Sequence, residues 1–126
     1  MPRVVHFEFL ADDPDRAVKF WEEAFGWKTQ TWEGATYWLL DTGEGELGIN
    51  GGIMRRSDFP KPVNAVCTVD VDSVDDAVGK VERAGGRVIK DKFQVGDMGL
   101  SAYCEDTEGN VFGVWETLPG AQTSPS

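Results

Sequence analysis

Apolar and polar positions follow the same series of patterns twice along this chain. Residues 4–10 alternate well enough for a strand with one polar face. The acidic turn at residues 12–14 then predicts a helix start, because a capping carboxylate precedes a proline at an early helical position. Apolar residues spaced by about one helical turn predict a single buried stripe, made of Ala17, Trp21, Ala24 and Phe25. Gly26 is the expected end of this helix.

Short strand-like runs follow the first helix. They lie at residues 28–32, 36–41 and 47–54, and glycine-containing turns separate them. Residues 55–62 contain two prolines and several charges. This stretch is therefore the expected connector to the second half of the chain.

Residues 65–88 repeat residues 5–28 at a shift of 60 residues, with identical residues at seven positions, for example Asp12/Asp72 and Gly26/Gly86. A strand is expected at 64–71, and the pattern Ser73-x-x-Asp76 resembles a capping box at the start of a helix. Gly85-Gly86 should end that helix, and further strands are expected at 87–93, 100–104 and 110–116. Such a repeat indicates two copies of one supersecondary unit, neither of which buries its apolar face alone.

The predicted element order is βαβββ, a linker and βαβββ again. Strand-rich halves with one helix each predict an α+β fold whose sheets are covered by helices on one face only. We expect a single domain at residues 1–118, made of modules 4–54 and 63–117. Residues 119–126 are small and polar and are expected to form a flexible tail.

This arrangement resembles the vicinal oxygen chelate superfamily, which includes glyoxalase I, extradiol dioxygenases and bleomycin- and fosfomycin-resistance proteins. The resemblance is carried by Val5-His6-Phe7-Glu8, by Phe20-Trp21-x3-Phe25-Gly26-Trp27, by the helix start at 11–17, and by residues 71–77, 84–86 and 105–113. It implies that each βαβββ module forms half of a glyoxalase-like cup, with the helices outside. Because one fold hosts many activities, the resemblance is more specific for fold than for function.

Metal-dependent members of this superfamily carry ligands on the first and fourth strands of both modules. The resemblance implies His6 at the first of these positions, about Val66 at its counterpart, and Gly113 on the last strand. The fourth strand of the first module has no carboxylate in residues 47–53. Three of the four ligands are therefore missing, and we expect neither the standard metal site nor a resident cofactor.

A rebuilt metal site is the alternative. By strand alternation Glu8 shares the face of His6, and Asp70 shares the face of Val66. A site of His6, Glu8 and Asp70 is conceivable on this pattern. The other interpretation of His6 is a family position without its metal, hydrogen-bonded within the cup.

Two functional hypotheses follow from the resemblance. In the first, the cup binds a small, largely planar organic ligand without chemistry, as resistance proteins of the superfamily do. Glycines at the metal positions, Gly51, Gly52 and Gly113, would then open space, and the candidate contacts are Trp38, Asp70, Tyr103 and Trp115. In the second, the chain is a glyoxalase-like lyase or isomerase, metal-free or with a rebuilt metal site, in which His6 is a general base oriented by Glu8.

The composition limits the classes of molecule that we expect the protein to bind. A formal net charge of −10 and a sequence pI near 4.4 argue against nucleic acid and anionic membrane surfaces, both of which require a basic face. The chain has no signal-like start and no long apolar span, so we expect a cytoplasmic protein. Cys67 and Cys104 should be small buried residues. A homodimer is expected, because it is common in the superfamily and the apolar stretch 63–71 would otherwise leave an unprotected edge.

Overall fold

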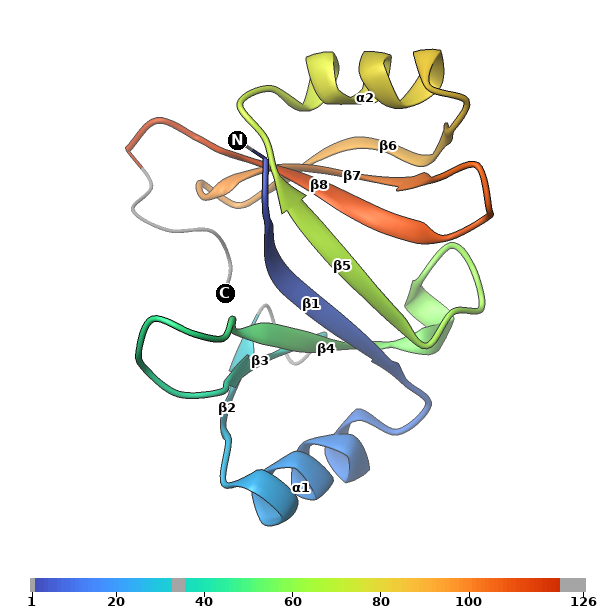
Figure 1. The fold of residues 1–126 in the computed structure, drawn as a ribbon. Helices are drawn as coiled ribbons and strands as arrows, with labels where there is room; N and C mark the ends of the chain where they lie inside the picture. The colour runs from blue at the N-terminus through green and yellow to red at the C-terminus, as the bar shows by residue number, and fades with distance from the viewer. Residues whose placement is uncertain (1, 33–35, 121–126) are drawn as a thin grey trace. The chain divides into compact units, whose positions relative to one another are not determined.

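The computed structural model of this chain describes residues 2–32 and 36–120. These residues form eight strands, two α-helices and one short 3-10 helix (Figure 1). The fold divides into two compact units. One spans His6–Ala65, and the other joins the residues from Val66 onward to the few that precede His6.

The first module has its strands in the order β2-β3-β4-β1. Strand β1 runs parallel to β4, whereas β2, β3 and β4 are antiparallel neighbours. Helix α1 packs on one face of these strands (Figure 1). The elements are β1 (Val4–Ala11), α1 (Pro14–Phe25), β2 (Lys28–Trp32), β3 (Tyr37–Asp41) and β4 (Gly51–Arg55), and the 3-10 helix η1 (Arg56–Asp58) follows.

The second module repeats this plan, with its strands in the order β6-β7-β8-β5. Strand β5 is parallel to β8, and helix α2 covers β6, β7 and β8 (Figure 1). The elements are β5 (Ala65–Asp70), α2 (Val74–Arg83), β6 (Arg87–Val95), β7 (Gly99–Glu105) and β8 (Val111–Thr117). The predicted α+β class and the two βαβββ modules are thereby confirmed.

The helix ends follow their predicted caps. The backbone N–H of Arg16 donates to the Asp13 carboxylate over 3.2 Å, and the N–H of Asp76 donates to the Ser73 hydroxyl over 3.1 Å. Gly26 ends α1 with a left-handed φ of 72°, which a residue with a side chain rarely adopts. Local sequence therefore determines where both helices start and where the first one stops.

Each helix buries an apolar cluster against its own strands. Under α1 the buried residues are Ala11, Trp38, Leu40 and Ile53, and Trp21 packs against them with its ring stacked on Phe9 at 5.0 Å. Under α2 they are Val74, Ala102 and Val114. Because each cluster joins one helix to its own strands, each module contains a core of its own.

Four details differ from the sequence prediction. Ala24 and Phe25 are exposed, Phe25 by 65%, because they lie in the last turn of α1, where the Phe25 ring stacks on Trp21. Trp21, which belongs to the predicted buried stripe, is half-buried. Cys67 is exposed, whereas Cys104 is buried.

The fourth difference concerns the strand predicted at 47–54, which begins only at Gly51. Gly48 has a φ of 102°, and the Asn50 side chain accepts a hydrogen bond from the Thr42 N–H at 2.9 Å. Residues 47–50 therefore belong to a loop, and Leu47 is 95% exposed there.

We expect Ile53→Ala to lower the free energy of unfolding by about 2–5 kcal/mol, as measured by urea denaturation. Ile53 is fully buried beneath α1, so the truncation leaves a cavity. The matched control is Ile49→Ala, because Ile49 is 37% exposed and lies outside the strands. Equal losses for the two variants would contradict this description of the core.

Candidate functional site

The face of the first-module sheet that points away from α1 carries the polar candidates. Strand alternation directs Phe7 and Phe9 toward the α1 cluster, so His6 and Glu8 lie on the opposite face. On β3 the same alternation places Tyr37 opposite to Trp38. We call this surface, which carries His6, Glu8 and Tyr37, the His6 face.

His6 is held on this face by one hydrogen bond. The side chain is 3% exposed, and its Nε2 lies 2.7 Å from the Tyr37 hydroxyl oxygen. The other ring nitrogen, Nδ1, is buried and has no hydrogen-bond partner in the described part of the chain. Since nearly all buried polar atoms in proteins are paired, an unpaired Nδ1 marks this position as a candidate contact for a molecule from outside.

Burial also determines the charge of His6. Desolvation lowers the pKa of the ring from 6.5 to about 4, because a buried cation loses its hydration. The imidazole is therefore neutral at pH 7, with one nitrogen as a donor and the other as an acceptor. A neutral ring recognises a ligand by hydrogen bonding rather than by charge.

Tyr37, which the sequence analysis missed, hydrogen-bonds to Nε2 of His6. Glu8 is 5% exposed and shares the face of His6. Residues i and i+2 of a strand point to the same side and are separated by about 6.7 Å along the chain direction. The orientation of His6 by Glu8 stays a prediction. The only sequence signal for Tyr37 was its alternation with Trp38, and it required knowing which face the strand buries.

The glycines on β4 do not open space, contrary to the prediction. A side chain at Gly51 would overlap the backbone and ring of Phe7, and one at Gly52 would overlap the phenol of Tyr37. Gly113 in the second module is similarly covered, since a Cβ there would lie 2.9 Å from the Thr68 hydroxyl and 3.4 Å from the Tyr103 ring. These glycines allow close packing of neighbouring side chains against the strands.

In the second module, the face away from α2 carries Tyr103 and Trp115. The register pairs Tyr103 with Gly113 and Ser101 with Trp115, which places all four on the same face. Tyr103 is 5% exposed and Trp115 is 2% exposed. The indole N–H of Trp115 donates to the Thr117 hydroxyl over 3.0 Å. Both predicted aromatic contacts therefore lie on the face of the module that its own helix leaves uncovered.

Two other predicted contacts lie in different surroundings. Trp38 belongs to the buried cluster under α1 and faces away from His6, so we do not carry it forward as a ligand contact. Asp70 ends β5, where its side chain is exposed and its backbone N–H donates to the Arg3 carbonyl over 2.8 Å. That bond also pairs part of the β5 edge that the sequence analysis expected to be unprotected.

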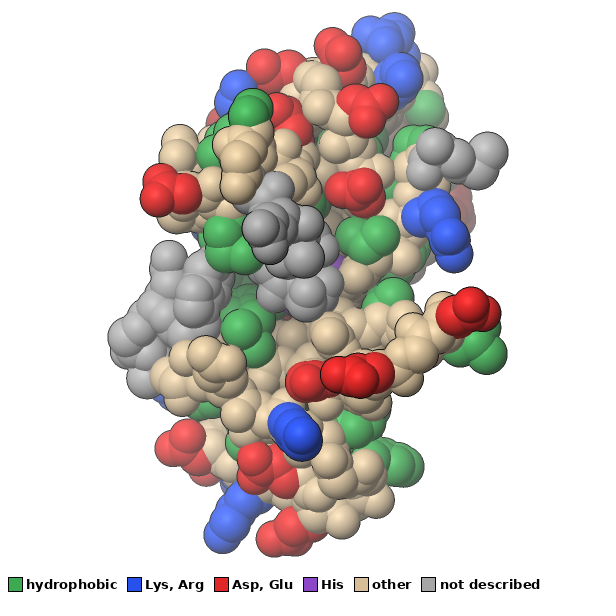
Figure 2. Space-filling view, turned by 90° about the vertical axis from the view of Figure 1, so that its left-hand side faces the viewer, with side chains coloured by type: hydrophobic (Ala, Val, Ile, Leu, Met, Phe, Trp, Pro, Cys, Tyr) green, Lys and Arg blue, Asp and Glu red, His purple; other side chains and the backbone are tan. Residues whose placement is uncertain are grey.

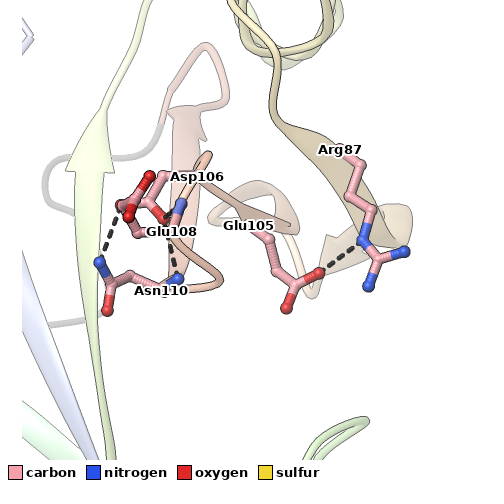
Figure 3. A network of polar contacts seen from close by, with 5 residues as sticks. All are labelled: Arg87, Glu105, Asp106, Glu108 and Asn110. Atoms are coloured by element: carbon pink, nitrogen blue, oxygen red, sulfur yellow. Dashed lines mark hydrogen bonds and ion pairs between the residues drawn. The ribbon is translucent and has the colours of Figure 1, made fainter.

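A buried carboxylate, Glu105, ends β7 in the second module. Figure 3 shows it pointing toward Arg87 of β6, whose Nε lies 2.5 Å from the Glu105 Oε1. Beside it the Asp106 carboxylate accepts hydrogen bonds from the backbone N–H groups of Glu108 and Asn110, both at 2.8 Å (Figure 3). The hydrogen bonds from Asn110 lower the pKa of the Asp106 carboxyl. This network holds the turn into β8.

The described residues do not fit the metal set that the family resemblance implies. No three His, Cys, Asp or Glu side chains within 2–32 and 36–120 are grouped closely enough to hold a metal ion. The counterpart of His6 is the apolar Val66, and Gly113 is covered by Thr68 and Tyr103. These residues offer too few donors for a catalytic divalent ion.

The surface agrees with the acidic composition. Figure 2 shows Asp and Glu side chains spread over the displayed face. Among the described helices, none is long and apolar enough to cross a membrane.

Comparison with known proteins gives a family and a fold. The model of the Glyoxalase/Bleomycin resistance protein/Dioxygenase superfamily matches residues 3–114. The Mycobacterium tuberculosis protein "Putative glyoxylase CFP32" is 30% identical over 115 residues, a match that covers 89% of this chain and 43% of that protein. This chain thus spans less than half the length of that relative. A "Glyoxylase-like domain-containing protein" of Didymella fabae is 27% identical over 118 residues, covering 90% of this chain and 91% of the relative.

Solved structures share the fold at low sequence identity. Hypothetical protein BH1468 from Bacillus halodurans has a TM-score of 0.69 at 10% identity, covering 97% of this chain and 99% of the other. A methylmalonyl-CoA epimerase in complex with methylmalonyl-CoA and NH4+ has a TM-score of 0.68 at 16% identity, covering 98% and 99%. At these identities the likeness establishes the arrangement of elements and leaves activity open.

The neutral state of His6 predicts a pH dependence of stability. The pKa of His6 in the folded chain, about 4, lies below the ordinary value of 6.5. Between these two pH values the unfolded chain therefore binds a proton at His6 that the folded chain does not bind. The contribution of His6 to stability is complete above pH 6.5 and is lost as pH falls toward 4. At pH 5.5 we expect the free energy of unfolding to be about 1 kcal/mol lower than at pH 7.5, as measured by urea unfolding. The His6→Gln variant should not show this pH-dependent loss.

Because His6 is the only histidine, NMR titration of its ring checks the same point directly. The ring should remain neutral at pH 5.5. An ordinary midpoint near 6.5 would show that this side chain is not buried as described.

Proposed function

We propose that this chain, which belongs to the Glyoxalase/Bleomycin resistance protein/Dioxygenase superfamily, binds a small organic molecule through a metal-independent site centred on His6. The observation that carries the proposal is the buried, neutral imidazole whose Nδ1 has no partner in the described residues. An unpaired buried polar atom costs about 1–3 kcal/mol of stability. A ligand that completes this hydrogen bond would recover part of that free energy as affinity.

The second module by itself also offers candidate contacts for a flat ligand. Tyr103 and Trp115 place aromatic rings on the face of this module that α2 leaves uncovered. Stacking on such rings contributes about 0.5–1.5 kcal/mol beyond burial. Glu8 adds a buried carboxyl group next to His6 along β1, and Asp70 offers an exposed one at the end of β5. The proposal is strengthened by one solved structure of the same fold, which is described as a complex with methylmalonyl-CoA.

A second candidate is a lyase or isomerase in which His6 removes a proton from the substrate. It is favoured by the same neutral ring, because a deprotonated imidazole accepts a proton without first losing one. A pKa of about 4 makes the ring a weak base, however, and rate usually follows basicity. We therefore place binding first. The two functions can be separated by using NMR to monitor the exchange of carbon-bound hydrogen of methylmalonyl-CoA in D2O. A protein that only binds this probe does not catalyse the exchange.

We expect a thermal-shift screen to find a stabilising compound among planar aromatic amides, cationic antibiotics and acyl-CoA esters. His6→Ala should weaken the binding of that compound at least 10-fold in calorimetry, because one hydrogen bond to a buried group is lost. Cys67→Ser is the matched control, since Cys67 is exposed and lies outside the His6 face, and it should bind like the wild type. Undiminished binding to His6→Ala would rule out a site centred on this ring.

We further propose that the chain is a homodimer. The support is an exposed aromatic surface on α1, where Phe20 is 56% exposed and Phe25 is 65% exposed beside Trp21. Light scattering should give about twice the chain mass of 13.9 kDa. Phe20→Ser with Phe25→Ser should return the mass to that of one chain. A monomeric wild type at micromolar concentration would contradict the proposal.

A further inference from the structure

We infer that Tyr37 takes the place on His6 that a metal ion would occupy, and that it fixes the ring as an Nδ1–H donor for a neutral carbonyl oxygen. The part about Tyr37 concerns the protein alone. The part about the carbonyl group rests on the proposed function, since it names the chemical class of the ligand.

The first step concerns the ring nitrogens of His6. A metal ion binds histidine through the lone pair of one neutral ring nitrogen. Nε2 lies 2.7 Å from the Tyr37 hydroxyl oxygen, so an ion at that nitrogen would have to displace the phenol. While this hydrogen bond is present, Nε2 is not available to bind a metal ion.

The second step concerns the neighbouring strand β4. Gly52 is the register partner of Glu8, and it faces the same side of the sheet. A carboxylate here would bring a second acidic side chain close to Glu8 and His6. A Cβ at Gly52 would overlap the Tyr37 phenol, so a carboxylate cannot be placed there while Tyr37 keeps its position. The Tyr37 side chain therefore blocks two potential metal ligands, which are Nε2 of His6 and a carboxylate at position 52.

The third step assigns the proton. A phenol O–H is a good donor, and the lone pair of a neutral imidazole nitrogen is a good acceptor. With the Tyr37 hydroxyl donating to Nε2, the ring proton must lie on Nδ1, which is the atom without a partner in the described residues. The group that completes this site is consequently a hydrogen-bond acceptor. An anionic acceptor is disfavoured, because the ring is buried and neutral, and burying a charge without a counter-ion costs far more than burying a neutral carbonyl.

The first experiment tests the tautomer in the ligand-free protein. His6 is the only histidine, so nitrogen-15 NMR reports a single imidazole. We expect Nδ1 to give the signal of a protonated nitrogen and Nε2 that of an unprotonated one. Tyr37→Phe, which keeps the ring but removes the hydroxyl, should shift the ring toward the Nε2–H form. A wild-type ring protonated on Nε2 would overturn the assignment. Cys67→Ser is the control, and it should leave the spectrum unchanged, because Cys67 is exposed and lies outside the His6 face.

The second experiment tests the exclusion of metal with Ni²⁺ alone as probe. One equivalent should leave the His6 signals of the wild type unchanged. Tyr37→Ala with Gly52→Glu frees Nε2 and adds a carboxylate, so it should bind Ni²⁺ at least 10-fold more tightly than Gly52→Glu alone. Circular dichroism establishes that each variant is folded. Tyr37→Phe preserves the aromatic ring but frees Nε2, so Ni²⁺ should broaden the His6 signals of this variant, which gives a second readout. Tight Ni²⁺ binding at His6 in the wild type would overturn the inference.

The third experiment tests the ligand class with two probes of matched size, acetamide and acetate. Acetamide at millimolar concentration should shift the Nδ1 proton of His6, whereas acetate should shift it less. A larger effect of acetate would overturn the preference for a neutral carbonyl. Should neither probe shift Nδ1 while the tautomer is as expected, the proposed ligand site fails and the role of Tyr37 stands.

Discussion

The parallel pairing of β1 with β4 is the constraint on which the rest of the first module depends. It places Phe7 beside Gly51 and Phe9 beside Ile53, and so directs one set of side chains to α1 and the other to the His6 face. A slip of one residue would exchange the two sets. His6 would then enter an aromatic core that has no hydrogen-bond partner for it, and the Phe7 ring would lose the space that Gly51 leaves. Core packing and the polar site are therefore specified by the same register.

Given this register, the glycines have a packing function that explains why the implied metal positions hold no ligands. Gly52 accommodates the phenol of Tyr37, and Gly113 accommodates the Thr68 hydroxyl and the Tyr103 ring. A carboxylate at either position would displace a neighbour that is already packed. At both positions the neighbouring side chains therefore occupy the space that a metal-binding side chain would need. A single glutamate at either position would have to displace these neighbours before it could bind a metal ion.

Much of the fold could be predicted from the sequence because its signals are local. Asp13, Ser73 and Gly26 act within one helical turn, and the repeat at a shift of 60 residues supports both modules at once. Facing directions on short strands were harder to predict. Tyr37 and Trp38 are adjacent aromatic residues on a five-residue strand, and only its pairing with β4 decides which one joins the core. His6 and Glu8 were therefore named as candidates from the sequence, whereas the Tyr37 partner of His6 was missed.

The two modules have diverged in the chemistry of their uncovered faces while keeping one plan. At the shift of 60 residues, His6 corresponds to Val66 and Glu8 to Thr68, so the polar pair of β1 has no equivalent on β5. The second module instead buries Tyr103 and Trp115 on its corresponding face. The metal set that the family resemblance implies needs donors on both copies, and neither Val66 nor Thr68 supplies an imidazole or a carboxylate. The divergence between the copies therefore leaves the buried histidine of the first module without the counterpart that such a set would need.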